Sequence, residues 1–363
     1  MPELYVGLMS GTSLDGIDAV AADFGNDRFH LLHSHYQPFQ PQLRDTLLAL
    51  HDPGRDELHR AATAANQLSH AYAAAIRTLL AQAGLTPSQI SAIGCHGQTV
   101  RHRPDAGYTI QLVNGALLAE LAGIAVVCDF RSRDIAAAGQ GAPLVPAFHH
   151  ELLHAPDRHR VIVNIGGIAN LTDLPPAGPV TGFDCGPGNM LLDAWIMERL
   201  GKTYDEDGAW AAQGKVLPAL LENLLSHDFF GCPPPKSTGR ETFNMAWLQR
   251  TLSGSEPEVD VQATLLELTA AGIARAIDSH CSGATEIFLC GGGARNQALV
   301  RRLLALLPGK KLEATDALGV SAEWLEALAF AWLARQALKH RPGNLPGVTG
   351  ARGPRILGAI YPA

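Results

Sequence analysis

The chain has 363 residues, of which 47% are hydrophobic and 17% are charged, and its formal net charge is −7. This length is enough for two domains or one large domain, and the composition excludes a disordered chain and a coiled coil. The acidic balance and the lack of a Lys/Arg cluster argue against a protein that binds nucleic acid or a membrane surface.

The six cysteines are scattered along the chain, and none form a Cys-x-x-Cys pair. Several lie in apolar, strand-like runs, where buried free thiols are common. We therefore expect reduced structural cysteines and a cytoplasmic protein. The sequence has no early basic segment followed by an apolar one, and no charge-free apolar run of about 18 residues. We expect neither a signal peptide nor a membrane span.

The first predicted elements form a β-hairpin. Two apolar runs, Leu4–Met9 and residues 17–24, predict strands, and the Ser, Gly, Thr and Asp residues between them are typical of a tight turn. Backbone N–H groups and hydroxyls crowded at such a tip form a concavity that binds anions. Asp15 or Asp18 could meet a metal ion there, directly or through water. From the residues alone, an ordinary tight turn is the alternative.

The glycines of this turn, Gly11 and Gly16, have the spacing of a P-loop. However, Ile17 and Asp18 follow where a P-loop carries Lys and Ser or Thr. A P-loop also begins a helix, whereas this stretch begins a strand. We therefore reject the P-loop and retain phosphate as the ligand.

Helix and strand patterns alternate through the rest of the first half, which predicts an α/β fold. Residues 56–83 predict a long helix that ends at Gly84, and residues 90–95 predict a strand that leads directly to His96. Polar residues at the end of a buried strand often line a cleft in open α/β sheets.

A short helix over 114–123 and a strand over 124–130 come next, and Arg131 follows this strand. Residues 136–146 are rich in Gly, Pro and Ala, and they predict the boundary between two lobes. A compact connection is favoured over a flexible linker because the segment has no run of Ser or charged residues.

The second half restarts the opening pattern. Residues 161–172 again predict a strand, a glycine turn at Gly166 and Gly167, and a second strand, as a weak echo of residues 4–24. A duplicated hairpin can hold a polyphosphate from both sides. A coincidental hairpin is the alternative.

Asp184 stands in the Gly/Pro-rich sequence Phe-Asp-Cys-Gly-Pro-Gly-Asn, which predicts a turn just before a helix over Met190–Leu200. The helix dipole would favour the ionised carboxylate. An ionised carboxylate beside a glycine-lined cavity is a candidate general base. Locally, a capping or turn aspartate is the alternative.

Further helices are predicted over 204–213, 216–226, 260–279 and 321–339, and residues 235–241 predict a polar loop that is either structural or part of a site. The strand Glu286–Cys290 runs into Gly291, Gly292 and Gly293 and then a helix to residue 307. Three glycines at such a turn let a flat ligand approach the backbone. The spacing is not Gly-x-Gly-x-x-Gly, so a Rossmann site is disfavoured.

The stretch over residues 7–20, the motif around Asp184 and the loop over 235–241 resemble, in this order, the anhydro-N-acetylmuramic acid kinases. That family belongs to the actin, hexokinase and heat-shock-chaperone superfamily of ATP-binding folds. The resemblance spans nearly the whole chain and implies a two-lobed, actin-like ATPase fold of duplicated ribonuclease H-like domains with a central cleft. The implied lobes are 1–135 and 136–343, with the tail 344–363 packing back onto the first lobe. A homodimer is also implied.

The resemblance implies an ATP-dependent carbohydrate kinase. Such a transferase opens 1,6-anhydro-N-acetylmuramic acid by hydrolysis and phosphorylates O6, giving N-acetylmuramate 6-phosphate and ADP in peptidoglycan recycling. Asp184 would take a proton from the water that attacks the anomeric carbon, and the released O6 would attack the γ-phosphate. Mg²⁺ would bridge the ATP oxygens, held mostly through water by Asp15 or Asp18.

The implied ligand contacts fall into two groups. For ATP they are Gly11, Thr12, Ser13, Leu14, Asp15, Gly16, Ile17, Asp18, Asn164, Gly166, Gly167, Gly291, Gly292 and Gly293. Neither hairpin carries a Lys, so charge on the phosphates would be neutralised by the metal, backbone dipoles and arginines elsewhere.

The sugar carries a lactyl carboxylate, for which Arg131 is the expected partner, since a bidentate arginine suits a carboxylate. His96 and Glu326 are expected to hydrogen-bond the sugar. The alternatives are a surface salt bridge for Arg131, a buried structural histidine for His96 and the edge of an amphipathic helix face for Glu326.

Two other functions stay open. An ordinary sugar kinase of the same superfamily would use Asp184 to deprotonate a free sugar hydroxyl. An actin-like or chaperone-like ATPase would normally carry polymerising surfaces or a separate peptide-binding domain, and the sequence shows no extra domain.

Overall fold

The computed structural model describes residues 2–11, 14–25, 29–240 and 242–363. The chain forms two compact units: unit 1 contains Met1–Phe148 and Trp324–Ala363, and unit 2 contains His149–Glu323. These bounds differ from the lobes expected from the sequence, because residues 136–148 and 324–343 belong to unit 1. The central cleft stays a prediction.

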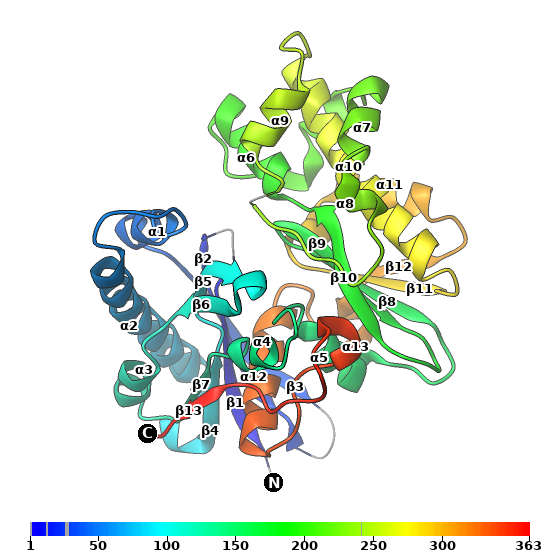
Figure 1. Cartoon of the computed structure of the whole chain (residues 1–363). Coiled ribbons are helices and arrows are strands. Elements are labelled where there is room, and N and C mark those ends of the chain that lie inside the picture. Colours follow the sequence, from blue (N-terminus) through cyan, green and yellow to red (C-terminus); the bar gives the residue numbers. More distant parts are fainter. Residues whose placement is uncertain (1, 12–13, 26–28, 241) are drawn as a thin grey trace. The chain divides into compact units, whose positions relative to one another are not determined.

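Unit 1 is built on a six-stranded sheet in the order β13-β7-β4-β1-β2-β3 (Figure 1). Its strands are β1 (Leu4–Met9), β2 (Gly16–Asp23), β3 (His30–Pro38), β4 (Ile90–Cys95), β7 (Val126–Cys128) and β13 (Ala359–Tyr361). Strands β1, β2 and β3 are antiparallel neighbours, and β4 and β7 run parallel to β1. The C-terminal strand β13 pairs with β7, so the tail lies on this unit.

Two helices cover β1 on opposite faces, as the alternation of side chains along a strand requires. Val6 and Leu8 belong to the same buried cluster as Tyr72 of α2 (Glu57–Ala83). On the other face a Cβ at Gly7 would lie 1.9 Å from the carbonyl oxygen of Ala327, in α12 (Leu325–Leu338). The backbone of α12 therefore lies directly on the sheet, and only glycine permits that approach.

The remaining elements of unit 1 lie around this sheet. They are α1 (Pro41–Leu48), β5 (Gln98–Arg103), β6 (Tyr108–Leu112), α3 (Gly115–Ala122), α4 (Ser132–Ala136) and α13 (Pro346–Thr349). Strands β5 and β6 form a separate two-stranded sheet. Helix α5 (Val145–Leu153) carries the chain into unit 2.

Unit 2 repeats the sheet order of unit 1. Its strands are β8 (Arg160–Ile165), β9 (Ile168–Leu174), β10 (Thr181–Pro187), β11 (Glu286–Cys290) and β12 (Lys311–Ala314), in the order β10-β9-β8-β11-β12. Three antiparallel strands are followed by two that are parallel to the first, as in β3-β2-β1-β4-β7. The expected α/β fold of duplicated ribonuclease H-like units is therefore confirmed.

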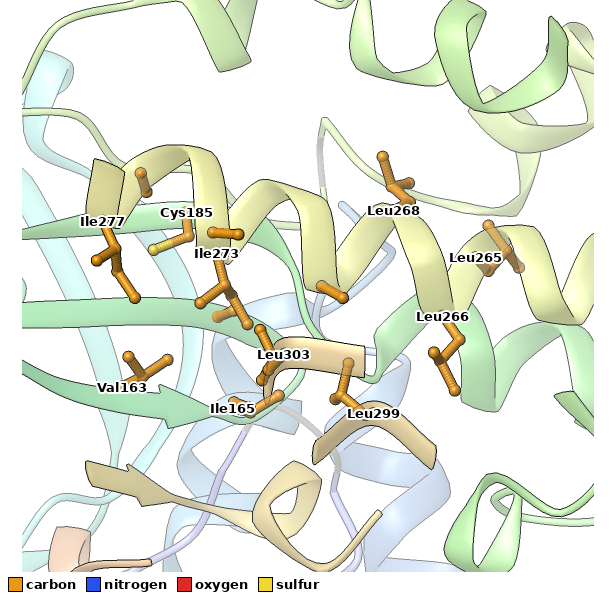
Figure 2. Packing of buried hydrophobic residues seen from close by; sticks show 14 of the residues in the cluster. Val163, Ile165, Cys185, Leu265, Leu266, Leu268, Ile273, Ile277, Leu299 and Leu303 are labelled. Carbon is orange, nitrogen blue, oxygen red and sulfur yellow. The ribbon is translucent and has the colours of Figure 1, made fainter. Parts of the chain in front are cut away.

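The core of unit 2 lies between this sheet and its helices, which are α6 (Met190–Leu200), α7 (Pro218–Leu225), α8 (Asp228–Gly231), α9 (Met245–Thr251), α10 (Glu258–His280) and α11 (Gln297–Leu306). Figure 2 shows Ile273 and Ile277 of α10 above Val163 of β8. Leu299 and Leu303 of α11 complete the same cluster. The long helix is buried along most of its length, which explains its apolar composition.

Several predicted elements differ from the structure. Residues 204–213 form two short 3₁₀ turns, because Asp207 and Gly208 adopt φ of +54° and +66° and break the helix. The strand predicted over 124–130 is limited to Val126–Cys128, and the helix predicted from 321 begins at Leu325. Within the part of the chain that the structure describes, no helix is long and apolar enough to span a membrane.

The prediction that Asp184 lies in a turn is wrong. Asp184 lies within strand β10, opposite Asn170 of β9, and the register shifts between Asp184 and Gly186. Gly186 absorbs this bulge with φ of +137°. Helix α6 begins only at Met190. The effect of a helix dipole falls off within about one turn of the helix end, so it acts only weakly on the Asp184 carboxylate.

Candidate active site

Three parallel strands of unit 1, β1, β4 and β7, end at the same edge of the sheet, and each is followed by residues that the sequence singles out. The hairpin tip follows β1, His96 follows β4, and Arg131 comes three residues after β7. Ligands in open α/β sheets bind at the carboxyl ends of such strands.

The backbone shapes the described part of the hairpin tip. The N–H of Leu14 donates to the carbonyl of Gly11 at 3.3 Å, and Leu14 adopts φ of +56°. The side chains of Leu14 and Ile17 are buried in the core, so these two residues can offer a ligand only backbone groups. Thr12 and Ser13, also expected to bind ATP, lie outside the described residues.

Two carboxylates flank the base of this tip. Asp15 is exposed and its Oδ1 accepts the N–H of Gly16 at 3.0 Å, while Asp18 is half-buried opposite Met9. Burial, together with the negative charges of Asp15 and Asp18, raises the pKa of Tyr36 to about 12. Both carboxylates therefore lie close to one phenol.

Among the described residues no three His, Cys, Asp or Glu side chains gather to hold a metal ion. The two carboxylates near Tyr36 instead fit a hydrated Mg²⁺, which keeps several waters and needs only one or two protein carboxylates.

Sequence reasoning missed the side chains that hold the tip in place. Gln98 is fully buried, and its Nε2 donates to the carbonyl of Gly11 at 3.1 Å. Ser10 Oγ lies 2.7 Å from Tyr72 OH and donates to the carbonyl of Gly97 at 3.3 Å. The available signal was a run of polar residues directly after a buried strand.

His96 and Arg131 are in direct contact. The Nε and Nη2 atoms of Arg131 lie 3.2 and 2.9 Å from His96 Nε2. Burial first, and then the Arg131 charge, hold the pKa of His96 well below its ordinary value. The imidazole is therefore neutral at pH 7, and its Nε2 accepts from the guanidinium.

Glu326 lies in the first turn of α12, four residues before Phe330. The ring of Phe330 packs against His96, with centroids 4.7 Å apart. Residues four apart share one face of a helix, so the helix presents Glu326 on the side that faces His96. The three residues expected to contact the sugar thus come from neighbouring parts of unit 1.

In unit 2, glycine backbones pack against one another at the carboxyl edge. The N–H groups of Gly188 and Asn189 donate to the carbonyls of Gly167 and Gly166 at 2.9 and 2.8 Å. A Cβ at Gly188 would lie 2.3 Å from the Gly166 carbonyl oxygen. The turn after β8 and the turn after Asp184 therefore form one backbone structure.

The turn after β11 joins the same edge. Gly291 has φ of +75°, and a Cβ there would lie 2.3 Å from Asn164 Oδ1. Asn164 is buried on β8, and this oxygen has no hydrogen-bond partner within the described ranges of the chain. Gly292 is exposed and Gly293 is buried against Ile165.

Asp184 is half-buried, and the polar loop around residues 236–240 holds its carboxylate. The N–H of Thr238 donates to Asp184 Oδ2 at 2.8 Å, and the N–H of Asp184 donates to the carbonyl of Lys236 at 3.1 Å. The Lys236 ammonium in turn donates to the carbonyl of Phe229 at 3.1 Å. The sequence left the role of this loop open, and the structure shows it positioning Asp184.

Unit 2 also contains a cavity of about 500 Å³ that is lined by residues of α10 and α11. Its walls come from α10, from α11 and from the second 3₁₀ turn with the segment after it, and they include Ala211, Leu266 and Ala298. Glu267 and Arg302 also line it and form an ion pair at 2.8 Å. Sequence reasoning missed this cavity because three distant segments build it.

Two ribonuclease H-like units, each with turns at the carboxyl edge of its sheet, define the class of actin-like ATP-binding folds. The family model described as anhydro-N-acetylmuramic acid kinase matches residues 3–363. The chain belongs to this family.

The relatives match over the same extent of the chain. The anhydro-N-acetylmuramic acid kinases of Nitrosospira multiformis and Nitrosomonas europaea are 62% and 60% identical, each over 99% of both chains. Among solved structures, the (R)-2-hydroxyglutaryl-CoA dehydratase component A of Acidaminococcus fermentans has a TM-score of 0.49 at 12% identity, covering 91% of this chain and 96% of that one.

Proposed function

We propose that this protein opens 1,6-anhydro-N-acetylmuramic acid by hydrolysis and uses ATP to phosphorylate O6. The products are N-acetylmuramate 6-phosphate and ADP. Membership of the family supports the substrate, and the observation that carries the mechanism is the half-buried Asp184 carboxylate held by the Thr238 N–H. The proposal places this reaction in peptidoglycan recycling.

Asp184 acts as the general base in this proposal. Its carboxylate takes a proton from a water molecule, whose oxygen forms a bond with the anomeric carbon. The bond between that carbon and O6 breaks, and its electron pair stays on O6. O6 then attacks the γ-phosphorus, the bond to the β-phosphate oxygen breaks, and ADP leaves. O6 has no proton while it is tied in the bridge, so the base is needed for water.

We assign the nucleotide to the glycine turns. A phosphate or ribose can approach the backbone at Gly166, at Gly167 and at the three glycines from Gly291. In unit 1, the described residues at the hairpin tip offer further N–H groups. The cavity beside α11, whose walls combine apolar residues with the Glu267–Arg302 ion pair, is of a size that suits a purine. Mg²⁺ held through water by Asp15 or Asp18 would neutralise phosphate charge.

We assign the sugar to His96, Arg131 and Glu326. The guanidinium of Arg131 matches the lactyl carboxylate of the substrate, and a neutral His96 can orient it without competing for that charge. Glu326 would accept a hydrogen bond from the sugar.

We also infer a cytoplasmic homodimer whose partners are small molecules rather than nucleic acid or membranes. All six cysteines are described, none of the six forms a disulfide, and five are buried, which suits a reducing compartment. Light scattering on the purified protein measures the dimer directly.

Assays with two different sugars as phosphoryl acceptors distinguish the proposed enzyme from an ordinary sugar kinase. The proposed enzyme phosphorylates the anhydro sugar, whereas an ordinary sugar kinase requires a free 6-hydroxyl and would phosphorylate N-acetylmuramic acid instead. ADP formation is measured with each sugar and with none. Turnover of only the open sugar contradicts the proposal, and ADP release without sugar points to an ATPase.

A further inference from the structure

Asp134, in α4, is a fully buried carboxylate that lies outside the reaction described above. Its Oδ2 accepts the N–H of Gly141 at 2.8 Å. Its Oδ1 accepts from Asn344 Nδ2 at 2.6 Å and from Thr349 Oγ1 at 2.7 Å. Burial of a carboxylate is costly unless hydrogen bonds replace its hydration, and here three neutral donors do so.

These bonds fix the loop over residues 139–141 from both sides. The N–H of Gln140 donates to the carbonyl of Thr349 at 2.7 Å, so the C-terminal segment also holds the loop by its backbone. A Cβ at Gly139 would lie 2.1 Å from Asp134 Oδ2, and Gly141 adopts φ of +67°. The loop is thus wrapped tightly around the carboxylate.

The fixed loop holds one side of the Arg131 guanidinium. The carbonyl of Gly141 accepts from Arg131 Nη1 at 2.7 Å, while His96 accepts from Nε and Nη2. A movement of Gly141 would remove the hydrogen bond that holds Nη1 and would change the orientation of the guanidinium. Bidentate binding of a carboxylate tolerates little such rotation.

We propose that Asp134 is a positioning residue, which orients Arg131 through Gly141 and so sets the preference for a sugar that carries a carboxylate. The inference rests on the proposed function, in which Arg131 binds the lactyl carboxylate of the substrate.

The test compares an acidic sugar with a neutral one. The acidic sugar is 1,6-anhydro-N-acetylmuramic acid, for which kcat and KM are measured. The neutral one is 1,6-anhydro-N-acetylglucosamine, which lacks the lactyl group and is measured by its inhibition constant. Asp134→Asn places an amide among hydrogen-bond donors, and Thr349→Val removes one donor while leaving the carboxylate. Asp105→Asn, in an exposed ion pair of the same unit, is the matched control.

We expect Asp134→Asn to raise KM for the acidic sugar about 10- to 100-fold, the size of a lost charge-assisted contact, with kcat changed less than about threefold. The inhibition constant of the neutral sugar should stay within about threefold. Thr349→Val should raise the same KM by about three- to tenfold, and it carries the test if Asp134→Asn does not fold. Asp105→Asn should match wild type.

The inference is overturned if a folded Asp134→Asn, or Thr349→Val, weakens the binding of both sugars equally or of neither. Asp134 would then be a structural residue. Failure of the proposed function has a different signature. In that case wild type would bind the acidic and neutral sugars alike, or Arg131→Ala would keep the preference for the acidic one.

Discussion

In unit 1, side chains hold the turns at the carboxyl edge of the sheet, whereas in unit 2 glycine backbones hold one another. Gln98 and Asp134 fix the unit 1 segments through single hydrogen bonds to backbone groups. Gly188 and Gly291 in unit 2 approach their neighbours so closely that no side chain fits. Apart from the additional strand β13 in unit 1, the strand order is the same in both units, so the two units differ in how the turns at the carboxyl edge are held and not in where these turns lie.

This difference predicts two kinds of sensitivity. A substitution at a glycine of unit 2 displaces backbone and should cost more than the removal of one supporting hydrogen bond in unit 1. Four substitutions follow in order of decreasing expected effect, and two of them, Gly291→Ala and Gln98→Leu, test this contrast directly.

The largest effect is expected for Asp184→Asn. The amide cannot accept a proton from water, so kcat should fall by about 10²–10⁴-fold. ATP binding, measured by calorimetry, should be unchanged. Asp157→Asn, an exposed carboxylate of unit 2 paired with Arg158, serves as the control. A variant that keeps a tenth of the activity would remove Asp184 from the role of base.

Gly291→Ala should follow. The added Cβ meets Asn164 Oδ1 at a backbone φ that L-residues rarely adopt, so the turn must move, and we expect KM for ATP to rise about 10- to 100-fold. Gly309→Ala is the matched control, because its φ is +79° and nothing lies within 4 Å of the new Cβ. It should cost about 1 kcal/mol of stability and leave KM for ATP unchanged. Equal effects of the two on KM would contradict close packing as the cause.

Gln98→Leu tests the support of the hairpin in unit 1. Loss of the hydrogen bond to the Gly11 carbonyl should raise KM for ATP about fivefold, the value of one net hydrogen bond. Gln111→Leu removes an amide that bonds Thr99 and Thr109 instead, and it should leave KM for ATP unchanged. If both variants raise KM alike, the tip does not depend on Gln98.

The smallest effect is a pH dependence of stability. Burial, and then the Arg131 charge, lowers the pKa of His102 to about 4, whereas an unfolded histidine titrates near 6.5. Between pH 6.5 and about 4 the unfolded state binds more protons, so the free energy of unfolding should fall as pH falls. His102→Gln should flatten this slope in denaturant titrations at pH 7, 6 and 5. An unchanged slope would show that His102 is not the group responsible.

Local patterns were enough to predict the strands of both hairpins, the helix Met190–Leu200 and the strand before Gly291, because each depends on neighbouring residues. The supporting contacts were not predictable in this way. Gln98 and Gly11 lie 87 residues apart, Thr238 and Asp184 lie 54 apart, and Thr349 and Asp134 lie 215 apart. Only the folded chain brings such pairs together. The Gly/Pro pattern after Asp184 indicated a turn. A β-bulge favours the same residue types, so the sequence did not distinguish the bulge from a turn.

The most direct measurement of the central claim is turnover of the anhydro sugar with ATP in ¹⁸O-labelled water, for wild type and Asp184→Asn. With wild type we expect ¹⁸O on C1 of a 6-phosphorylated product, and with Asp184→Asn we expect that product to be lost. A phosphorylated product without label at C1 would contradict water attack at the anomeric carbon and would make the protein an ordinary sugar kinase.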